Sequence, residues 1–585
     1  MKKIVDNIVG SKAGWLVLLV VLVGVNFLAS QFTFRLDLTK EKRYTLSKAT
    51  KDLLKGLDNK VQIDVFLKGD FPAGFRKLAN STQEFLQLLK DNNGSKIQYR
   101  FISPEENIEG ARNTYGDSLL SMGAVPINLT VQKKAGESSN IIFPVAVMHY
   151  KGQQALVNLY PGASGRISQD EINSAEALME YQFAKTLDRL TATQRPGIAY
   201  SLGNGEPVDG RTYDLRETLS QDYKFGTIDL NKGAIVPPDV NVLLIVKPSK
   251  PFTEEEKFKI DQFVMRGGKL LCFIDNLYAE QDSLAFKPET IAFDRNLNLT
   301  DQFFRYGTRI NTDLVMDLQC DMIPFVVGGT ADNPQYEFLH WNYFPLLSPA
   351  DGQSLSKNLG YVAGKFVNSM DTITVEGVKK LPILVTSANS RIISTPALIS
   401  LNENKNVPQD DKFRRNAIPV AMLLEGKFTS LYKNRLTKTQ QDSLAAYNQQ
   451  FSPTSQDNKM IIVADGDMVL NDFMPNPDDP AQQPAPLPMG WNKYTYGEYM
   501  KQSEYGKTFI PVANREFLLN CVEYLVSNPA ISETRNKDIV LRLLDGPKVQ
   551  ARKTTWQFFT IGLPVLLVIL LGWIFQQIRK RKYAA

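Results

Sequence analysis

Two long apolar segments, one near each end, frame a chain that is otherwise mostly polar. Residues 13–29 contain Asn26 as their only strongly polar member, and residues 556–575 form a second such segment. A helix that crosses the ~30 Å hydrocarbon core of a membrane needs about 20 apolar residues. Both segments are therefore predicted to be transmembrane helices, although the first is only just long enough. The pattern predicts one large soluble block tethered to a membrane at both ends.

The charges beside the two segments predict the orientation of the chain. Lys2, Lys3 and Lys12 precede the first segment, and the basic run 579–582 follows the second. Positive charge stays on the cytoplasmic side, so both termini are predicted to be cytoplasmic and the soluble block periplasmic, at the inner membrane. The basic residues between 35 and 43 oppose this orientation, but large domains cross the membrane largely regardless of such charges.

A cleaved signal peptide is the alternative explanation of the first segment. Cleavage after residue 29 or residue 30 would place Phe27 or Leu28 at the −3 position, where a small residue is required. The first segment is therefore predicted to remain as an anchor, with Trp15 and Asn26 as its notable residues.

The second segment carries the marks of a membrane-spanning helix. Trp556 and Trp573 lie near its two ends, as residues of an aromatic belt do. Pro564 lies within the segment and is expected to kink the helix, which neighbouring helices can accommodate.

The first part of the soluble block, residues 31–190, alternates between strand and helix patterns. Apolar and polar residues alternate where strands are expected, and apolar residues recur every three or four positions in the expected helices. The predicted elements are a helix over 44–57, strands over 61–65 and 97–101, a helix with a capping box at Ser81-x-x-Glu84, a strand pair over 141–148 and 155–160, and a helix over 171–190. This order predicts a first α/β domain.

The second part, residues 191–530, begins with another β-α-β alternation. Its predicted strands cover 198–202, 240–246, 270–274, 382–386, 418–424 and 460–464, and its predicted helices begin at a capping box, Thr253-x-x-Glu256, and cover 517–525. The run 240–246 is continuously apolar, which is typical of a parallel strand buried on both faces. We predict an open, doubly wound sheet. The later strands are expected to extend it within one domain with insertions, and two domains remain the alternative.

Three polar stretches are predicted to be loops, over 402–415, 437–459 and 475–488. A charged connector over 531–555 leads to the second apolar segment, predicted to span 556–576, and residues 577–585 form a basic tail. Residues 1–30 hold the predicted cytoplasmic N-terminus and first span.

Composition excludes several classes of protein. The 585 residues are 43% hydrophobic and 22% charged, with a net charge of +5 and no basic run in the soluble block, which excludes a nucleic-acid-binding surface. The three cysteines, Cys272, Cys320 and Cys521, are far apart and form no disulfide framework. Cys272 and Cys521 lie in apolar patterns, where cysteine acts as a small core residue.

The residues that usually carry catalysis are scarce. His149 and His340 are the only histidines, and neither an H-E-x-x-H nor a G-x-S-x-G motif occurs. The run Gly506-Lys507-Thr508 fails as a phosphate-binding loop because Lys501 stands where the pattern needs a glycine. We therefore predict no enzymatic activity, no cofactor and no bound metal, and any ATP hydrolysis must come from another subunit.

The best candidate for a ligand site is the turn Gly203-Asn204-Gly205-Glu206. It follows a strand, at the edge of the sheet where open α/β folds bind ligands. Glycines allow close approach of a ligand to the backbone, and Asp275 follows another strand and is predicted to line the same cleft. The spacing does not match a dinucleotide motif, and a purely structural turn is the alternative. Ala464-Asp465-Gly466-Asp467 offers two carboxylates for a cation but is interpreted as a turn, because two ligands match no calcium loop.

Several motifs together point to a known family. They are Arg43-Tyr-Thr-Leu-Ser47, Gly203-Asn-Gly-Glu-Pro207, Gly267-Gly-Lys-Leu-Leu271 through Asp275, and Val463-Ala-Asp-Gly-Asp467, between the two end segments. In this order they resemble the GldG family, gliding-motility-associated auxiliary proteins of an ABC transporter in Bacteroidetes. The resemblance implies an ABC permease subunit (GldF-like) and an ABC ATPase subunit (GldA-like) as partners. Proteins of that family are described as substrate-binding-like, but the resemblance implies no established substrate and no catalytic residues.

The resemblance also bears on the fold and on possible chemistry. The middle region is similar to an α/β domain of the flavodoxin or glutamine-amidotransferase-like type, shared with intraflagellar-transport proteins. Enzymes of that type carry a nucleophilic cysteine on a sharp turn after a strand. Here the comparable turn carries Asn204, and Cys272 lies inside a strand, which argues against amidotransferase chemistry.

Three functions remain open on the sequence. The first is a non-enzymatic, membrane-anchored subunit of an ABC transporter required for gliding motility. The second is a structural scaffold of the gliding or secretion machinery without a small ligand, in which the aromatic run 336–344 would contact other proteins. The third, a hydrolase or transferase, is least favoured because of the residue inventory.

Overall fold

The computed structural model describes most of the chain from residue 45 to residue 583. Before residue 45 it describes residues 19, 20, 22–24 and 26, and after residue 45 it leaves out 70, 109–112, 125, 134–135, 161–168, 193, 234, 286, 331–332, 351, 354, 357–358, 402–409, 475–483, 497–511, 527–530, 532–533 and 535–552. The chain forms two compact units, Met1–Lys537 and Asp538–Ala585. The protein is an α/β protein whose mixed sheets contain parallel runs.

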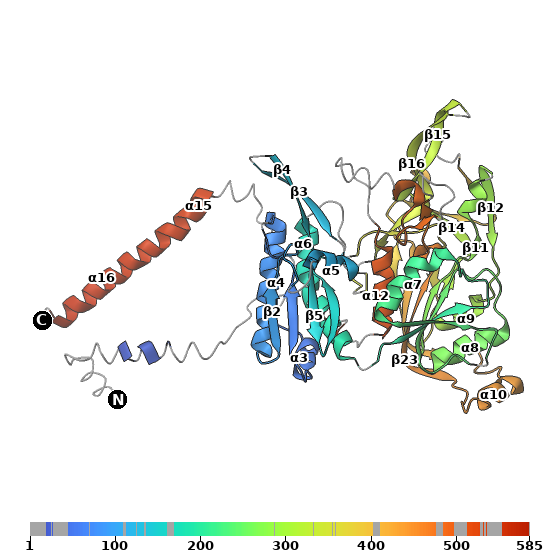
Figure 1. Cartoon of the computed structure of the whole chain (residues 1–585), viewed down its shortest axis with the longest axis horizontal. Coiled ribbons are helices and arrows are strands. Elements are labelled where there is room, and N and C mark those ends of the chain that lie inside the picture. The colour runs from blue at the N-terminus through green and yellow to red at the C-terminus, as the bar shows by residue number, and fades with distance from the viewer. Residues whose placement is uncertain are drawn as a thin grey trace. The chain divides into compact units, whose positions relative to one another are not determined.

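The first sheet, of which β2 and β5 are labelled in Figure 1, has four strands in the order β2-β1-β5-β6. Its strands are β1 (Val61–Val65), β2 (Ile97–Phe101), β5 (Val145–Tyr150) and β6 (Gln153–Asn158). The pair β1 and β2 is parallel and is joined through helix α4 (Ala73–Asn92), whereas β5 and β6 add antiparallel strands. The predicted strands over 61–65 and 97–101 are thus confirmed.

Helices cover one face of this sheet, because the apolar side of each helix faces the strands. Helix α6 (Gln169–Thr191), predicted over 171–190, packs with α4 and with α3 (Lys48–Lys55) on the buried residues of β1 and β5. Phe75 and Phe183 are buried in this core. The side-chain oxygen of Ser47 caps α3 by accepting the N–H of Thr50, which explains why the helix begins there.

Two predictions in this region are wrong in detail. Ser81 does not cap a helix: it lies in the middle of α4, where its hydroxyl donates to Glu176 across 2.7 Å. The predicted strand 141–148 is two strands, because Ile141 and Ile142 are the last residues of β4 (Gly136–Ile142) and Pro144 separates them from β5. Strand β4 pairs with β3 (Ile127–Lys133) as a separate hairpin, and helix α5 (Tyr115–Ser121) lies between β2 and β3 in the sequence.

The second sheet has ten strands, of which five form a parallel run in the order β8-β7-β9-β10-β23. These strands are β7 (Gly197–Leu202), β8 (Lys224–Asp229), β9 (Val240–Val246), β10 (Lys269–Phe273) and β23 (Thr454–Val463). Four antiparallel strands continue the sheet beyond β23: β22 (Pro419–Thr429), β19 (Val378–Val385), β16 (Asn333–Pro349) and β15 (Cys320–Thr330). The tenth strand, β17 (Val362–Ala363), pairs with β16. The later predicted strands therefore do extend the sheet that begins near Ile198.

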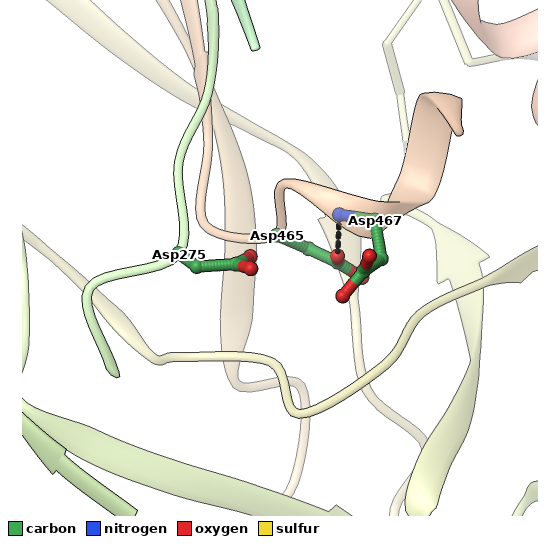
Figure 2. Close-up of side chains that lie close together, drawn as sticks. All are labelled: Asp275, Asp465 and Asp467. Carbon is green, nitrogen blue, oxygen red and sulfur yellow. Dashed lines mark hydrogen bonds between the residues drawn. The ribbon is translucent and has the colours of Figure 1, made fainter. Parts of the chain in front are cut away.

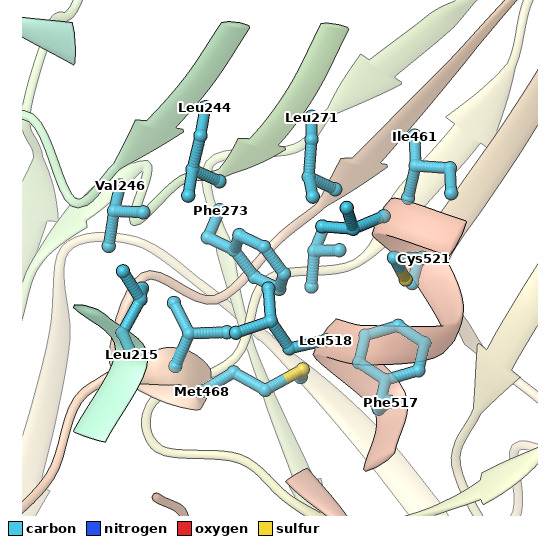
Figure 3. Packing of buried hydrophobic residues seen from close by; sticks show 14 of the residues in the cluster. Leu215, Leu244, Val246, Leu271, Phe273, Ile461, Met468, Phe517, Leu518 and Cys521 are labelled. Carbon is cyan, nitrogen blue, oxygen red and sulfur yellow. The ribbon is translucent and has the colours of Figure 1, made fainter. Parts of the chain in front are cut away.

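Helices lie on both faces of the parallel run. On one face, α7 (Tyr213–Asp222) and α12 (Asn514–Val526) pack on Leu244, Leu271 and Phe273 (Figure 3). On the other face, α8 (Glu254–Met265) and α9 (Thr300–Tyr306) pack on alternate residues of the same strands, including Cys272. The predicted capping box is present, since Thr253 and Glu256 bond reciprocally at the start of α8.

The long segment between β10 and β22 forms smaller sheets around the main one. Its elements include β11 (Leu277–Tyr278), β12 (Glu289–Asp294), β13 (Thr308–Ile310), β14 (Asp313–Asp317), β18 (Met370–Thr372), β20 (Ser390–Ser394) and β21 (Ala397–Ser400). Strands β15 and β16 form a long hairpin (Figure 1).

The predicted polar loops had mixed outcomes. The stretch 437–459 is not a loop, because it contains helix α10 (Lys438–Ala445) and the first residues of β23. Most of the stretches 402–415 and 475–488 lies outside the described residues, apart from short elements such as β25 (Ala485–Pro486), which pairs with β24 (Phe473–Met474).

The C-terminal unit contains one long apolar helix. Helix α15 (Lys553–Gln557), a π-helical turn over Phe558–Gly562 and helix α16 (Leu563–Tyr583) run on as one continuous rod (Figure 1). Residues Lys553–Arg581 have a mean hydropathy of 2.5 over their most apolar window, and theirs is the one helix within the described residues that is long and apolar enough to cross a membrane. The π-helical turn ends two residues before Pro564, which lacks the N–H that an α-helical bond needs.

The structure describes some of the predicted anchor residues but not all of them. Trp556 and Trp573 lie in this helix with exposed side chains. Of the first apolar segment, Trp15 lies outside the described residues, and Asn26 is described as helical and exposed. The structure therefore shows one possible membrane anchor, at the C-terminal end, and a second span stays a prediction.

Candidate functional site

The predicted site residues all lie at the carboxyl edge of the parallel strands. Gly203–Glu206 follow β7, Asp275 follows β10, and Asp465 and Asp467 follow β23. Helices α7 and α8, which follow β7 and β9, lie on opposite faces of the sheet. The order in which strands are added to the sheet therefore reverses between β7 and β9. That is where open α/β sheets bind their ligands.

The Gly203–Glu206 turn is locked against the loop after β9. The N–H groups of Ser249 and Lys250 both donate to the carbonyl oxygen of Asn204 over 2.8 Å, and the Ser249 hydroxyl donates to the Gly205 carbonyl over 3.1 Å. Gly205 has a φ of +77°, and a Cβ there would collide with Ser249 Oγ. Glycine is required at Gly205 for both reasons, so the close approach that it allows is taken by the protein's own backbone.

The polar side chains of this turn are also engaged inside the protein. Glu206 is buried and accepts the Ser201 hydroxyl at 2.9 Å and the Asn204 N–H at 2.8 Å. The Asn204 amide donates to Glu256 at 3.1 Å, while its Oδ1 is buried without a hydrogen-bond partner. Burial raises the pKa of Glu206, with Ser201 and the Asn204 N–H opposing that effect and the nearby Glu256 adding to it. This geometry is that of a structural turn more than of an open site.

A second group of residues gathers three carboxylates, from Asp275, Asp465 and Asp467 (Figure 2). One oxygen of each lies within 4.8 Å of the others. Asp465 accepts the N–H of Asp467 at 2.8 Å and that of Lys365 at 2.8 Å, and Asp275 accepts the N–H of Gly466. Hydrogen bonds thus tie the end of β10 to the turn after β23.

Lys247 lies directly against these carboxylates. Its ammonium is 2.6 Å from Asp467, 3.1 Å from Asp275 and 3.0 Å from Glu280, and only 5% of its side chain is exposed. Its φ of +44° is rare for a residue other than glycine. The side chain is therefore the cation of this cluster, and the arrangement does not fit a metal ion, because the ammonium contacts two of the three carboxylates.

The electrostatics of the cluster follow from burial and from these contacts. Burial acts to lower the pKa of Lys247, but the charges of Asp275, Asp467 and Glu280 outweigh it and raise that pKa. Burial raises the pKa of Asp275 to about 6, although Lys247 opposes the shift. The pKa of Asp467 is lowered despite burial, because Lys247 and Lys365 stabilise its charged form.

A second layer of ion pairs surrounds the cluster. Arg295 pairs with Glu280 at 2.7 Å, and Lys365 pairs with Asp472 at 3.0 Å. Gly466 lies so close to the Lys247 side chain that a Cβ there would be 2.7 Å from Lys247 Cβ. The groups are thus packed and paired with one another, an arrangement that holds four segments of the chain together.

The structure brings together some of the predicted residues but not others. Asp275 meets Asp465 and Asp467, which the sequence analysis treated separately. Asp275 contacts Gly466 and Lys247, whereas the Gly203–Glu206 turn is bonded to Ser249 and Lys250 in the loop after β9. The residue that sequence reasoning missed is Lys247, and its one signal is a lysine placed directly after a continuously apolar strand.

The remaining candidates lie elsewhere. Burial raises the pKa of the Cys272 thiol, which lies inside β10. His149 lies 3.3 Å from Asp64, and His340 Nδ1 lies 2.9 Å from the Cys320 carbonyl oxygen. The run 506–508 falls outside the described residues.

Two family models match the chain. One, described as "ABC-type uncharacterized transport system", matches residues 195–521, and the other, a domain of unknown function, matches residues 40–149. A relative from Borreliella burgdorferi, described as an uncharacterized protein, is 23% identical over 457 residues, which are 76% of this chain and 79% of the relative.

Solved structures show weak likeness. The N-terminal domain of mmIFT52 is 12% identical with a TM-score of 0.27, and the match covers 47% of this chain and 88% of that one. A thua-like protein from Parabacteroides merdae is 9% identical with a TM-score of 0.20, over 41% of this chain and 76% of that one. TM-scores this low do not establish a shared fold.

Proposed function

The chain belongs to the family described as ABC-type uncharacterized transport system, and from that premise we propose that it is a membrane-anchored auxiliary subunit without catalytic activity. The observation that carries the proposal is the extent of the family match. Residues 195–521 run from just before β7 into α12, so they take in the whole ten-stranded sheet. Membership implies association with an ABC transport system.

The absence of catalysis is part of the proposal, and the geometry of the sheet edge supports it. The Lys247 ammonium is held by three carboxylates, which leaves it a poor base or nucleophile. The Asn204 turn carries no nucleophile, and Cys272 is buried with a raised pKa. An auxiliary subunit needs no such group, because a partner ATPase supplies the energy.

The finer role follows the resemblance of the sequence motifs. We propose an ABC permease subunit (GldF-like) and an ABC ATPase subunit (GldA-like) as partners, and gliding motility as the process served. The proposal includes an open, doubly wound sheet of the flavodoxin type, which the strand order β8-β7-β9-β10-β23 supports. It also includes two spans, with both termini in the cytoplasm and the sheets in the periplasm.

A pull-down of the tagged full-length chain in mild detergent tests this proposal. Mass spectrometry should identify a polytopic permease and an ATPase. Replacing residues 556–575 with leucine should abolish their recovery if the span contacts the permease, whereas Pro564→Leu alone is the matched control and should retain them. Recovery of envelope or motility proteins alone, without a permease, would sink the proposal.

The scaffold hypothesis is the second candidate, and the closed Gly203–Glu206 turn favours it, since a scaffold needs no ligand cleft. The aromatic run 336–344 supports it less than expected. Trp341, Tyr343 and Phe344 are residues of β16 whose side chains are buried in a hydrophobic core, and Tyr336 is exposed near the tip of the hairpin. A contact surface on this hairpin would use Tyr336 with Val326, not the whole run.

A further inference from the structure

A cavity of about 250 Å³ lies beside the start of the β15–β16 hairpin. Residues from β15, from β16 and from the segment 490–495 line it, together with Val512. The lining residues used below are Cys320, Asp321, His340, Trp491, Asn492 and Thr495. Neither the family match nor the proposed transporter role assigns anything to this cavity.

Asp321 is the acidic group of the cavity. One of its oxygens accepts the N–H of Met322 at 2.8 Å, and Asn492 also bonds to it. Among the described residues no lysine, arginine or histidine forms an ion pair with it, unlike Asp275 or Asp467. Burial raises its pKa, while these hydrogen bonds and the more distant charge of Lys365 oppose the shift.

His340 adds a hydrogen-bond acceptor to the same cavity. Its Nδ1 lies 2.9 Å from the carbonyl oxygen of Cys320, which can only accept a hydrogen bond. In the neutral imidazole the proton must then lie on Nδ1, and the other nitrogen, Nε2, is left as an acceptor. The cavity therefore offers a carboxylate and an imidazole acceptor to whatever enters it.

The donors that line the cavity are already used by the protein. The Asn492 amide donates to the carbonyl of Met322 at 3.2 Å, and the Thr495 hydroxyl lies 3.5 Å from the carbonyl of Asn492. Trp491 contributes an indole ring, held edge-on by Tyr496 at a centroid distance of 5.5 Å. An aromatic ring beside a carboxylate favours a cation, because the face of the ring is electronegative.

We propose that this cavity binds a small organic cation that carries a primary ammonium group. The ammonium would donate to the Asp321 carboxylate and to His340 Nε2, and its alkyl part would lie against Trp491. The volume suits a ligand smaller than a drug-sized molecule. A metal ion is not favoured, because the three carboxylates at the sheet edge form the one group of metal-type ligands that lie close together in the described part of the chain.

Calorimetry on the full-length protein in detergent tests the proposal, with butylammonium as the probe and 1-butanol as a neutral probe of equal length. Butylammonium should bind and butanol should not. Asp321→Asn keeps the shape and the acceptor for Met322 but removes the charge, so it should weaken butylammonium binding by about tenfold or more. Asp457→Asn makes the same change at an exposed residue of β23 and should leave binding unchanged.

The pH dependence supplies a second readout. Because the ammonium needs an ionised Asp321 and an imidazole acceptor on His340, affinity should fall as the pH is lowered, and the fall should be smaller in Asp321→Asn, which keeps only the imidazole. Equal binding of butanol, equal binding by Asp321→Asn, or no butylammonium binding to a folded protein would each overturn the proposal. A pull-down without a permease would overturn only the transporter role, so the two failures are distinguishable.

Discussion

Two turns at the carboxyl edge of the parallel strands, Gly203–Glu206 and Ala464–Asp467, are filled by the protein's own atoms in different ways. The first is closed by backbone hydrogen bonds that a glycine makes possible. The second is closed by charge, with Lys247 placed among carboxylates. A turn that resembles a ligand site in the sequence can therefore serve as a connection within the protein. We call the Gly203–Glu206 turn, held by close backbone packing, the steric joint, and the Ala464–Asp467 turn, held by ion pairs, the electrostatic joint. The two should respond to different perturbations.

Removing the charge of Lys247 should have the largest effect. Lys247→Met leaves Asp275 and Asp467 buried without their cation, which is expected to cost about 3–5 kcal/mol of unfolding free energy. Denaturant unfolding of the full chain in detergent measures this. The matched control is Lys224→Met, whose exposed pair with Asp239 should contribute about 0–1 kcal/mol. Equal losses in the two variants would show that the cluster is not an electrostatic joint.

The pH dependence of the charged turn comes next in size. The pKa of Asp275 is raised by burial from 3.8 to about 6, so the folded state favours the neutral carboxyl. Stability from this group is present below the unfolded pKa and is lost as the pH rises through about 6. Relative to Asp275→Asn, the wild type should lose about 3 kcal/mol between about pH 4 and pH 7.

That measurement is a pair of unfolding curves across this pH range, one for each protein. A parallel pH profile for wild type and Asp275→Asn would contradict the assignment. The Gly203–Glu206 turn serves as a comparison, since Gly205→Ala should lower the free energy of unfolding by the same amount at every pH in this range.

Gly205→Ala should destabilise the steric joint by about 2 kcal/mol, from the positive φ and from the collision with Ser249. Gly152 is the matched control, because its φ is +78° but a Cβ there meets nothing within 4 Å. Gly152→Ala should therefore cost about 1 kcal/mol, from backbone strain alone. If both variants lose the same free energy, the contact with Ser249 is not part of the joint.

The smallest effect is expected for Ser249→Ala. Its hydroxyl donates to the Gly205 carbonyl from an exposed position, so its loss should cost about 0.5 kcal/mol. The double variant with Gly205→Ala sharpens the comparison, because removing the hydroxyl relieves the collision. The two changes should then cost less together than the sum of the single variants, as a double-mutant cycle would measure.

Local patterns predicted the elements well where one physical signal dominated. The continuous apolar run 240–246 became the buried strand β9, and Thr253-x-x-Glu256 became a real capping box. The same pattern failed at Ser81, because helix α4 begins eight residues earlier and tertiary contact with Glu176 satisfies the hydroxyl. A capping-box motif is compatible with a helix N-terminus, but it does not by itself determine that a helix begins at that residue.

The site was less predictable for a geometric reason. Asp275 and Asp467 are far apart in the sequence, and only the pairing of β10 with β23 brings them together. No local pattern encodes which strands become neighbours in a sheet. Lys247 was missed because a lysine after a strand is usually solvated, and its burial depends on carboxylates supplied by two distant segments.

The pairing of β10 with β23 also has a kinetic consequence. During synthesis, β7, β8, β9 and β10 emerge first, and β10 then waits for a partner that lies on the order of 180 residues further along the chain. Until β23 arrives, one edge of a buried, apolar strand is open, and such edges invite pairing with other chains. The nascent protein is therefore expected to depend on holding factors during this interval, and slowed elongation between β10 and β23 should increase its aggregation.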